Sequence, residues 1–268
     1  MSIYLITGVS RGIGFAFLEN ISSNPSNTVI GLVRNASETK AKIASWNRSN
    51  IHILEADLDN YDSLKKSVEA VEAITPSLDY LIANAGLISS WSAFDPLSVL
   101  GQDPARLTTD LTQLFNTNVI GQIHLINLYM PFILKGKVKK IIAISTGFAD
   151  LDLTTEYGLH EAAPYAISKA ALNMVIAKFD AEWRKQGVLL MSVAPGAVEV
   201  GRSKKMTPEE MAKGMAMFGK FQQYASEFQG PTTPEVSVEL MLKVIENASI
   251  EKGDGGAFVS QFGNKQWL

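Results

Sequence analysis

The chain has 268 residues, a formal net charge of −3 and no cysteine. A hydrophobic share of 46% with 19% charged residues is enough for a folded core and argues against disorder. The slightly acidic balance argues against a nucleic-acid partner, and the lack of cysteine excludes disulfides and thiolate metal sites. His52, His124 and His160 are scattered without metal-ligand spacing, so we expect no metal site.

The sequence shows no segment that targets or inserts into a membrane. A predicted strand begins at Ile3 with no basic stretch before it, which is unlike a signal peptide. The apolar runs are broken well short of the roughly 20 residues that cross a bilayer. We therefore expect a cytoplasmic protein with no membrane partner.

The first predicted strand, Ile3–Ile6, leads directly into a glycine-rich turn with the spacing Gly-x-x-x-Gly-x-Gly. Apolar residues then recur at helical spacing, so the order is strand, glycine loop, helix. Glycines let a phosphate approach the backbone, and the start of the helix directs unpaired N–H groups towards it. A tight loop without a ligand would use the same residues. The expected cofactor contacts here are Gly8, Ser10, Arg11, Gly12, Ile13 and Gly14.

A second strand, Thr28–Val33, ends in Arg34, about 20 residues after the glycine loop, where such folds recognise the cofactor ribose. An acid at this place would accept from a 2′-hydroxyl, whereas an arginine suits a 2′-phosphate. Arg11 could supply a second guanidinium to the same phosphate, which favours NADP(H) over NAD(H). The alternative is that Arg34 simply ends an exposed strand.

Further strands alternate with helices along the rest of the chain. This alternation predicts an α/β fold, a single Rossmann-type doubly wound domain over residues 1–268 with a central parallel, about seven-stranded sheet flanked by helices. A surface loop is expected over residues 89–104. The remaining strands are predicted at Ile51–Ala56, Leu78–Ile82, Lys140–Thr146, Val188–Val193 and Ala257–Val259, and helices at 38–48, 61–74, 107–134, from 164 onwards and 234–247.

Tyr165 and Lys169 stand at i and i+4 on one face of a predicted helix. A tyrosine with a pKa of about 10 is a poor proton-transfer group near neutrality, and an adjacent ammonium brings it into range. Alone, such a pair is also common as an ordinary exposed helix pair. Tyr157 is the competing tyrosine, but Glu161 occupies the place of its lysine.

Two hydroxyls, Ser145 and Thr146, end the strand that precedes this helix. The carboxyl ends of parallel strands face the ligand crevice, so these hydroxyls are well placed for chemistry. Neighbouring strand residues face opposite ways, so only one of the two serves.

The glycine spacing, Asn84-Ala85-Gly86 after the fourth strand, Asn118 ahead of Val119-Ile120-Gly121, and the tyrosine–lysine pair resemble the short-chain dehydrogenase/reductase family over essentially the whole chain. Among its members, the chain is similar to fungal ketoreductases of the norsolorinic acid reductase type and to carbonyl reductases. The resemblance implies that Asn118 distorts its helix and holds a proton-relay water, and it favours Thr146 over Ser145 by register. It implies cofactor contacts from Asp57, Leu58, Asn84, Ala85, Gly86, Tyr165, Lys169, Pro195, Gly196 and Val198.

The same resemblance implies NADPH-dependent reduction of a small-molecule ketone or aldehyde, reversible as alcohol oxidation, by a homodimer or homotetramer. The tyrosine–lysine placement implies an insertion over residues 148–163, whose acids we expect to be solvated. Residues 201–231 form an expected substrate lid whose methionines and phenylalanines suit a hydrophobic substrate. A non-catalytic NADPH-binding regulator and an epimerase or dehydratase of the same family are the alternatives. The acids of the expected insertion are Asp150, Asp152, Glu156 and Glu161. The methionines and phenylalanines of the expected lid are Met206, Met211, Met215, Met217, Phe218 and Phe221.

Overall fold

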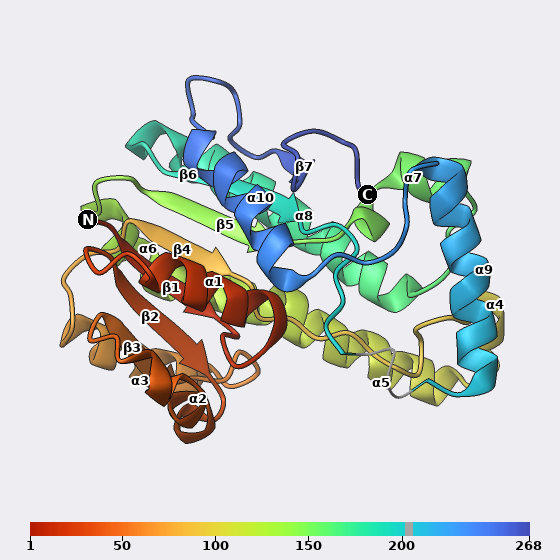
Figure 1. Ribbon diagram of the computed structural model, residues 1–268, viewed down its shortest axis with the longest axis horizontal. Helices are drawn as coiled ribbons and strands as arrows, with labels where there is room; N and C mark the ends of the chain where they lie inside the picture. Colours follow the sequence, from red (N-terminus) through yellow and green to blue (C-terminus); the bar gives the residue numbers. More distant parts are fainter. Residues whose placement is uncertain (202–205) are drawn as a thin grey trace.

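The computed structural model describes residues 1–201 and 206–268. Seven parallel strands form one sheet in the order β3-β2-β1-β4-β5-β6-β7, with helices on both faces (Figure 1). This confirms the predicted doubly wound fold. The strands are β1 (Ile3–Thr7), β2 (Thr28–Val33), β3 (Ile51–Glu55), β4 (Tyr80–Ala83), β5 (Lys140–Ile144), β6 (Leu189–Ala194) and β7 (Phe258–Ser260).

The strands are continuously apolar because both faces of the sheet are buried. Leu5 and Ile6 are adjacent in β1 and both are 0% exposed, but they belong to different core clusters. Ile6 packs on the face covered by α1 and α10, which lie in front of the sheet in Figure 1, and Leu5 packs on the face covered by α3, α6 and α8. These helices are α1 (Gly12–Ser22), α10 (Pro234–Asn247), α3 (Tyr61–Glu72), α6 (Gly121–Lys135) and α8 (Ala163–Trp183).

The strand order reverses between β1 and β4. From β1 the chain moves to β2 and β3 on one side, and from β4 it moves to β5, β6 and β7 on the other. The connections therefore leave the carboxyl ends of β1 and β4 in opposite directions, which opens the crevice where such folds bind ligands.

The helix predicted over 107–134 is two helices joined by a π-helical turn. α5 (Pro104–Phe115) runs into the π-turn η2 (Asn116–Ile120) and then into α6. The helix predicted over 38–48 is shorter: α2 (Ala36–Ile43) gives way to the 3₁₀ turn η1 (Ala44–Trp46). Asn47 then adopts a left-handed conformation with φ 51°, which ends the helical segment. The loop expected over 89–104 contains the short helix α4 (Leu97–Leu100).

The segment expected as an insertion, 148–163, contains α7 (Leu151–Glu156), preceded by the 3₁₀ turn η3 (Gly147–Ala149). The expectation that its acids are all solvated is wrong for Asp150 and Glu161, which are buried. Asp150 Oδ1 accepts from the Leu153 amide at 2.8 Å and so caps α7. Glu161 is buried because a lysine of α9 pairs with it. Asp152 and Glu156 are exposed, as expected.

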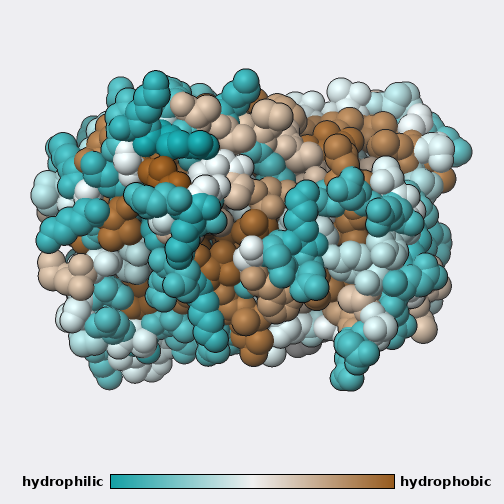
Figure 2. Space-filling view, turned by 90° about the horizontal axis from the view of Figure 1, so that it is seen from above, coloured by the Kyte–Doolittle hydropathy of each residue, from teal (hydrophilic) through white to brown (hydrophobic). Residues whose placement is uncertain are grey.

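α9 (Pro208–Tyr224) lies at one end of the molecule, beside the segment that carries α7 (Figure 1). Residues 202–205 of the expected lid lie outside the described residues. Seen from above, hydrophobic side chains are visible at this end and also over the middle of the molecule (Figure 2). Within residues 1–201 and 206–268, no helix combines the length and apolar character needed to cross a bilayer. The 3₁₀ turn η4 (Arg184–Gln186) follows α8.

Candidate active site

The glycine loop joins the end of β1 to the start of α1. Gly8 and Gly12 have φ angles of 76° and 57°, which favour glycine. A Cβ on Gly14 would lie 2.3 Å from the Gly8 carbonyl oxygen and 2.4 Å from Asn84 Nδ2, so only glycine fits there. No side chain in the described part of the chain caps the start of α1. The loop is thus a tight cradle whose helix amides are available to an anion.

Asn84 and Thr7 join the carboxyl ends of β4 and β1. Asn84 Nδ2 donates to the Thr7 carbonyl at 2.8 Å, and the Thr7 hydroxyl accepts from the amides of Asn84 (3.1 Å) and Ala85 (2.9 Å). Gln122 Nε2 donates to the Ala85 carbonyl at 2.7 Å. The Asn-Ala-Gly turn is therefore fixed on both sides. Thr7 was not among the site residues predicted from the sequence, although a hydroxyl that ends an apolar strand was a usable signal.

The expected adenosine-side residues lie in the glycine loop after β1 and just beyond the ends of β2 and β3. Arg11 and Arg34 are exposed, and Ser10 is half-buried. Asp57 Oδ1 accepts from the Asp59 amide at 3.1 Å, and Asn60, not Asp57, caps α3. Asp57 is therefore not the cap of the helix that follows it. Leu58 packs against Gly121 of α6, where a Cβ would meet the Leu58 carbonyl oxygen at 2.6 Å. Gly12 and Ile13 open α1, directly after Arg11.

Lys169 is buried beneath the half-buried Tyr165 at the start of α8. Its Nζ donates to the Ile144 carbonyl at 2.7 Å and lies 6.0 Å from the centroid of the Tyr165 ring. Burial lowers the pKa of Lys169 from 10.5 to about 8. A Cβ on Gly86 would lie 3.3 Å from this Nζ and 3.1 Å from Asn118 Oδ1. The tyrosine–lysine pair, Asn118 and the Asn-Ala-Gly turn therefore meet in one place.

Asn118 lies in the π-turn and is 0% exposed. Its Oδ1 accepts from the Leu87 amide at 2.7 Å, and its Nδ2 donates to the Leu87 carbonyl (2.8 Å) and to Ser168 Oγ (2.9 Å). Ser168 Oγ in turn donates to the Tyr165 carbonyl at 2.7 Å. The amide thus ties the loop after β4 to the first turns of α8. Ser168, which links Asn118 to the Tyr165 carbonyl, was not among the site residues predicted from the sequence.

Ser145 and Thr146 differ in burial. Ser145 is 2% exposed, and its Oγ has no hydrogen-bond partner within the described residues. Thr146 is half-buried, and its Oγ1 accepts from the Phe148 amide at 3.4 Å, a long contact. The Thr146 hydroxyl is the more accessible of the two, whereas the Ser145 hydroxyl is the one without a hydrogen-bond partner among the described residues. Both therefore stay candidates.

The segment after β6 closes the crevice on its other side. The Pro195 carbonyl accepts from Ser237 Oγ at 2.7 Å, and Gly196 has a φ of 79° with the Gln261 amide packed against it. Val198 pairs with Thr232 in an isolated bridge. Val200 follows and lies beside Gly12, so this segment reaches back to the glycine loop.

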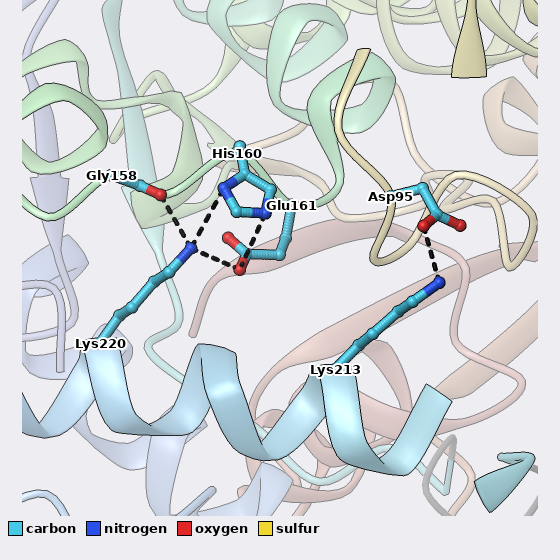
Figure 3. Close-up of polar contacts among 6 residues, drawn as sticks. All are labelled: Asp95, Gly158, His160, Glu161, Lys213 and Lys220. Atoms are coloured by element: carbon cyan, nitrogen blue, oxygen red, sulfur yellow. Dashed lines mark hydrogen bonds and ion pairs between the residues drawn. The ribbon is translucent and has the colours of Figure 1, made fainter. Parts of the chain in front are cut away.

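Two lysines fasten α9 across this end of the molecule (Figure 3). Lys220 Nζ contacts Glu161 Oε1 (2.7 Å), the Gly158 carbonyl (2.8 Å) and His160 Nδ1 (3.2 Å). Lys213 Nζ contacts Asp95 Oδ1 at 2.7 Å and, on its own helix, Glu209 at 2.9 Å. The ion pairs therefore join α9 to the loop after β4 and to the segment just before α8.

The inner face of α9 is mainly aromatic. The Phe221 ring lies 5.8 Å from Phe148, and Phe218 lies 5.2 Å from Phe228, measured between ring centroids. Met211 and Met215 are 52% and 72% exposed, so these two methionines of the expected lid face solvent. Tyr157 packs edge-on against Tyr224, with 5.2 Å between the ring centroids.

Comparison with known proteins gives one consistent result. Residues 2–211 match the family model described as short chain dehydrogenase. The chain is 53% identical to short chain dehydrogenase virK of Hypocrea virens and 45% identical to short-chain dehydrogenase/reductase iacC of Pestalotiopsis fici, each over 100% of both chains.

Solved structures with the same fold include carbonyl reductases. The NADPH-bound carbonyl reductase from chicken fatty liver superposes with a TM-score of 0.77 at 22% identity, covering 98% of each chain. The carbonyl reductase Sniffer of Drosophila melanogaster gives a TM-score of 0.77 at 24% identity, again over 98% of each chain. At these identities the likeness is one of fold.

Proposed function

The chain belongs to the short-chain dehydrogenase/reductase family of oxidoreductases, and from this premise we propose that it reduces a ketone or aldehyde to an alcohol with NADPH. The observation that carries the proposal is the buried Lys169 ammonium, fixed by the Ile144 carbonyl at 2.7 Å beneath the ring of Tyr165. This arrangement stands beside the glycine turn that a dinucleotide would occupy. The reaction is reversible as alcohol oxidation.

The chain's own groups would handle the proton. When bound, the reduced nicotinamide supplies the hydride that the carbonyl carbon accepts. Tyr165 donates its phenolic proton to the carbonyl oxygen. The ammonium of Lys169 favours the phenolate, which makes the phenol a stronger acid. Thr146 or Ser145 orients the carbonyl by a hydrogen bond. Asn118 supports the water that returns a proton to Tyr165. Because its Oδ1 and both of its Nδ2 hydrogens already have partners, we propose that the backbone of the wide π-turn contacts this water.

The residues around the crevice fit a nicotinamide dinucleotide. The glycine loop has no room for a Cβ at Gly14, and its helix amides suit the pyrophosphate. Gly86 borders Lys169, where the nicotinamide-side ribose would lie, and the turn at Pro195, Gly196 and Val198 would receive the carboxamide. We assign NADP(H) rather than NAD(H) on the exposed guanidinium groups of Arg11 and Arg34.

The substrate is proposed to be a small hydrophobic carbonyl compound. Its contacts would come from the aromatic face of α9 and from Phe148, rather than from Met211 and Met215, which face solvent.

A cytoplasmic location stays a prediction of the sequence. We propose a homodimer or homotetramer joined through α5, η2 and α8, because Phe115, Ile120, Ile167 and Met174 are exposed there. Sedimentation velocity would show a monomer if this surface has no partner copy.

NADPH consumption in the presence of diverse aliphatic and aromatic ketones and aldehydes tests the proposal, with product analysis to separate reduction from epimerisation or dehydration. Tyr165→Phe should lower turnover by a factor of at least about 100, while NADPH still binds, since only the proton donor is lost. Tyr157→Phe is the matched control and should keep full activity. Equal activity in the two variants would exclude Tyr165 as the proton donor, and NADPH binding without turnover in any carbonyl assay would favour the regulatory alternative.

A further inference from the structure

Lys42 on α2 reaches the glycine loop. Its Nζ donates to the Ser10 carbonyl at 3.2 Å and pairs with Glu38 Oε1 at 2.7 Å, one turn earlier on the same helix. The Lys42 side chain is 43% exposed, so this ammonium is held in place while still facing solvent. The pair lowers the pKa of Glu38 through the hydrogen bond and charge of Lys42.

Three cationic residues from three different segments are thereby brought to the carboxyl end of the sheet. Lys42 contacts Ser10, which directly precedes Arg11. The Gly8 amide donates to the Leu32 carbonyl at 2.8 Å, which fixes the loop against the end of β2, and Arg34 follows that strand. The carboxyl ends of β1 and β2 therefore carry two exposed guanidinium groups and an ammonium.

We propose that Lys42 is a specificity-determining residue for the cofactor and that its ammonium binds the 2′-phosphate of NADPH. This inference rests on the proposed NADPH-dependent function. An ammonium has three donors, and Ser10 and Glu38 are its two partners within the described residues, so one donor remains for a phosphate oxygen. NADH has a hydroxyl where NADPH has this dianionic phosphate, so the charge of Lys42 favours NADPH.

Lys42 differs from the two arginines in being ordered before the cofactor arrives. Arg11 and Arg34 make no side-chain hydrogen bond or ion pair with the described residues, so their long side chains must be immobilised on binding, which costs conformational entropy. Lys42 is already held by two contacts. Its interaction with the phosphate therefore loses less to ordering.

Isothermal titration calorimetry of the full chain with NADPH, NADH, adenosine 2′-monophosphate and adenosine 5′-monophosphate tests the assignment. Lys42→Met should weaken NADPH and adenosine 2′-monophosphate about tenfold, as expected for one lost charge-assisted hydrogen bond, and leave the other two ligands within about twofold. Lys42→Arg should keep most of the preference. Lys40→Met, an exposed lysine of the same helix, is the control and should behave as the wild type.

Removal of Glu38 gives an independent check. Glu38→Gln abolishes the negative charge beside the phosphate, so NADPH should bind more tightly and NADH should not change. Equal weakening of NADPH and NADH by Lys42→Met would overturn the proposal and leave Lys42 as a tether of α2 to the loop. Failure of the wild-type protein to bind NADPH or NADH would instead count against the proposed function.

Discussion

Lys169 carries its charge in a buried position. Its side chain is 3% exposed, and burial lowers its pKa from 10.5 to about 8. Because the unfolded chain holds this proton more tightly, the buried ammonium lowers the free energy of unfolding, with its full effect below about pH 8. This destabilisation decreases as the pH rises from 8 towards 10.5. A shift of this size corresponds to about 3 kcal/mol near neutral pH. The ammonium that we propose to act on Tyr165 is thus carried at the expense of stability.

Lys169→Met should separate these two effects. The variant removes a buried charge with a side chain of similar length, so the midpoint of urea unfolding at pH 7 should rise. Turnover should fall by at least about 100-fold because Tyr165 loses its ammonium. Lys178→Met, an exposed lysine of α8, should change neither quantity. A lower unfolding midpoint for Lys169→Met would show that its bond to the Ile144 carbonyl outweighs the cost of burial.

In the intact protein, kcat/KM for carbonyl reduction should fall as the pH rises through about 8, where Lys169 loses its proton. Above that pH the phenol of Tyr165 has no adjacent positive charge and becomes a weaker acid. A pH profile of kcat/KM measured at saturating NADPH checks this. A flat profile between pH 7 and pH 10 would argue against a titrating lysine in the reaction.

At the scale of elements, α1 and the ends of β1 and β4 depend on close backbone contact. Gly14 lies in the first turn of α1, against the Gly8 carbonyl and the Asn84 amide. A side chain there would separate the helix from both strands. The π-turn also allows a close contact between segments, because it lets the Asn118 side chain bond both Leu87 and Ser168 of α8.

Gly14→Ala should therefore weaken both folding and cofactor binding. Its Cβ would overlap the Gly8 carbonyl oxygen and Asn84 Nδ2, so we expect a loss of about 1–3 kcal/mol in the free energy of unfolding and loss of measurable NADPH binding. Gly219→Ala is the matched control: it lies inside α9 with open space around it, and should stabilise the protein by about 0.5–1 kcal/mol. Unchanged NADPH binding in Gly14→Ala would contradict the close packing of the loop.

At the scale of the whole molecule, Trp267 packs together segments that lie far apart in the chain. Trp267 is 3% exposed, stacks on Phe258 of β7 at 4.4 Å between ring centroids, and donates its amide to the Tyr224 hydroxyl of α9 at 3.0 Å. A Cβ on Gly147 would lie 2.8 Å from Trp267 Cβ. A small core around Trp267 therefore joins the chain end, α9 and the turn after β5.

Trp267→Ala should loosen that whole region. We expect a loss of about 3–5 kcal/mol in the free energy of unfolding, typical of a buried aromatic truncated to alanine, together with a higher KM for the carbonyl substrate. Urea unfolding and steady-state kinetics measure the two effects. Phe262→Ala removes a nearby aromatic that is 47% exposed and should alter neither by much. An unchanged KM would show that the core around Trp267 does not shape the substrate site.

The sequence by itself determined the sheet, the glycine loop and the tyrosine–lysine pair. These features depend on residues close together in the chain: apolar runs buried on both faces, glycine spacing, and two side chains one helical turn apart. A distortion of the helix at Asn118 was implied by the family resemblance, and the structure shows that it is a π-turn.

Only the tertiary structure decided how distant segments meet. Glu161 was expected in solvent, yet Lys220, 59 residues later, pairs with it and buries it. Likewise, Lys42 became a candidate cofactor residue only once the fold placed its ammonium 3.2 Å from the Ser10 carbonyl, 32 residues earlier. Burial and long-range hydrogen bonds depend on which surfaces pack together, and local sequence patterns do not encode that.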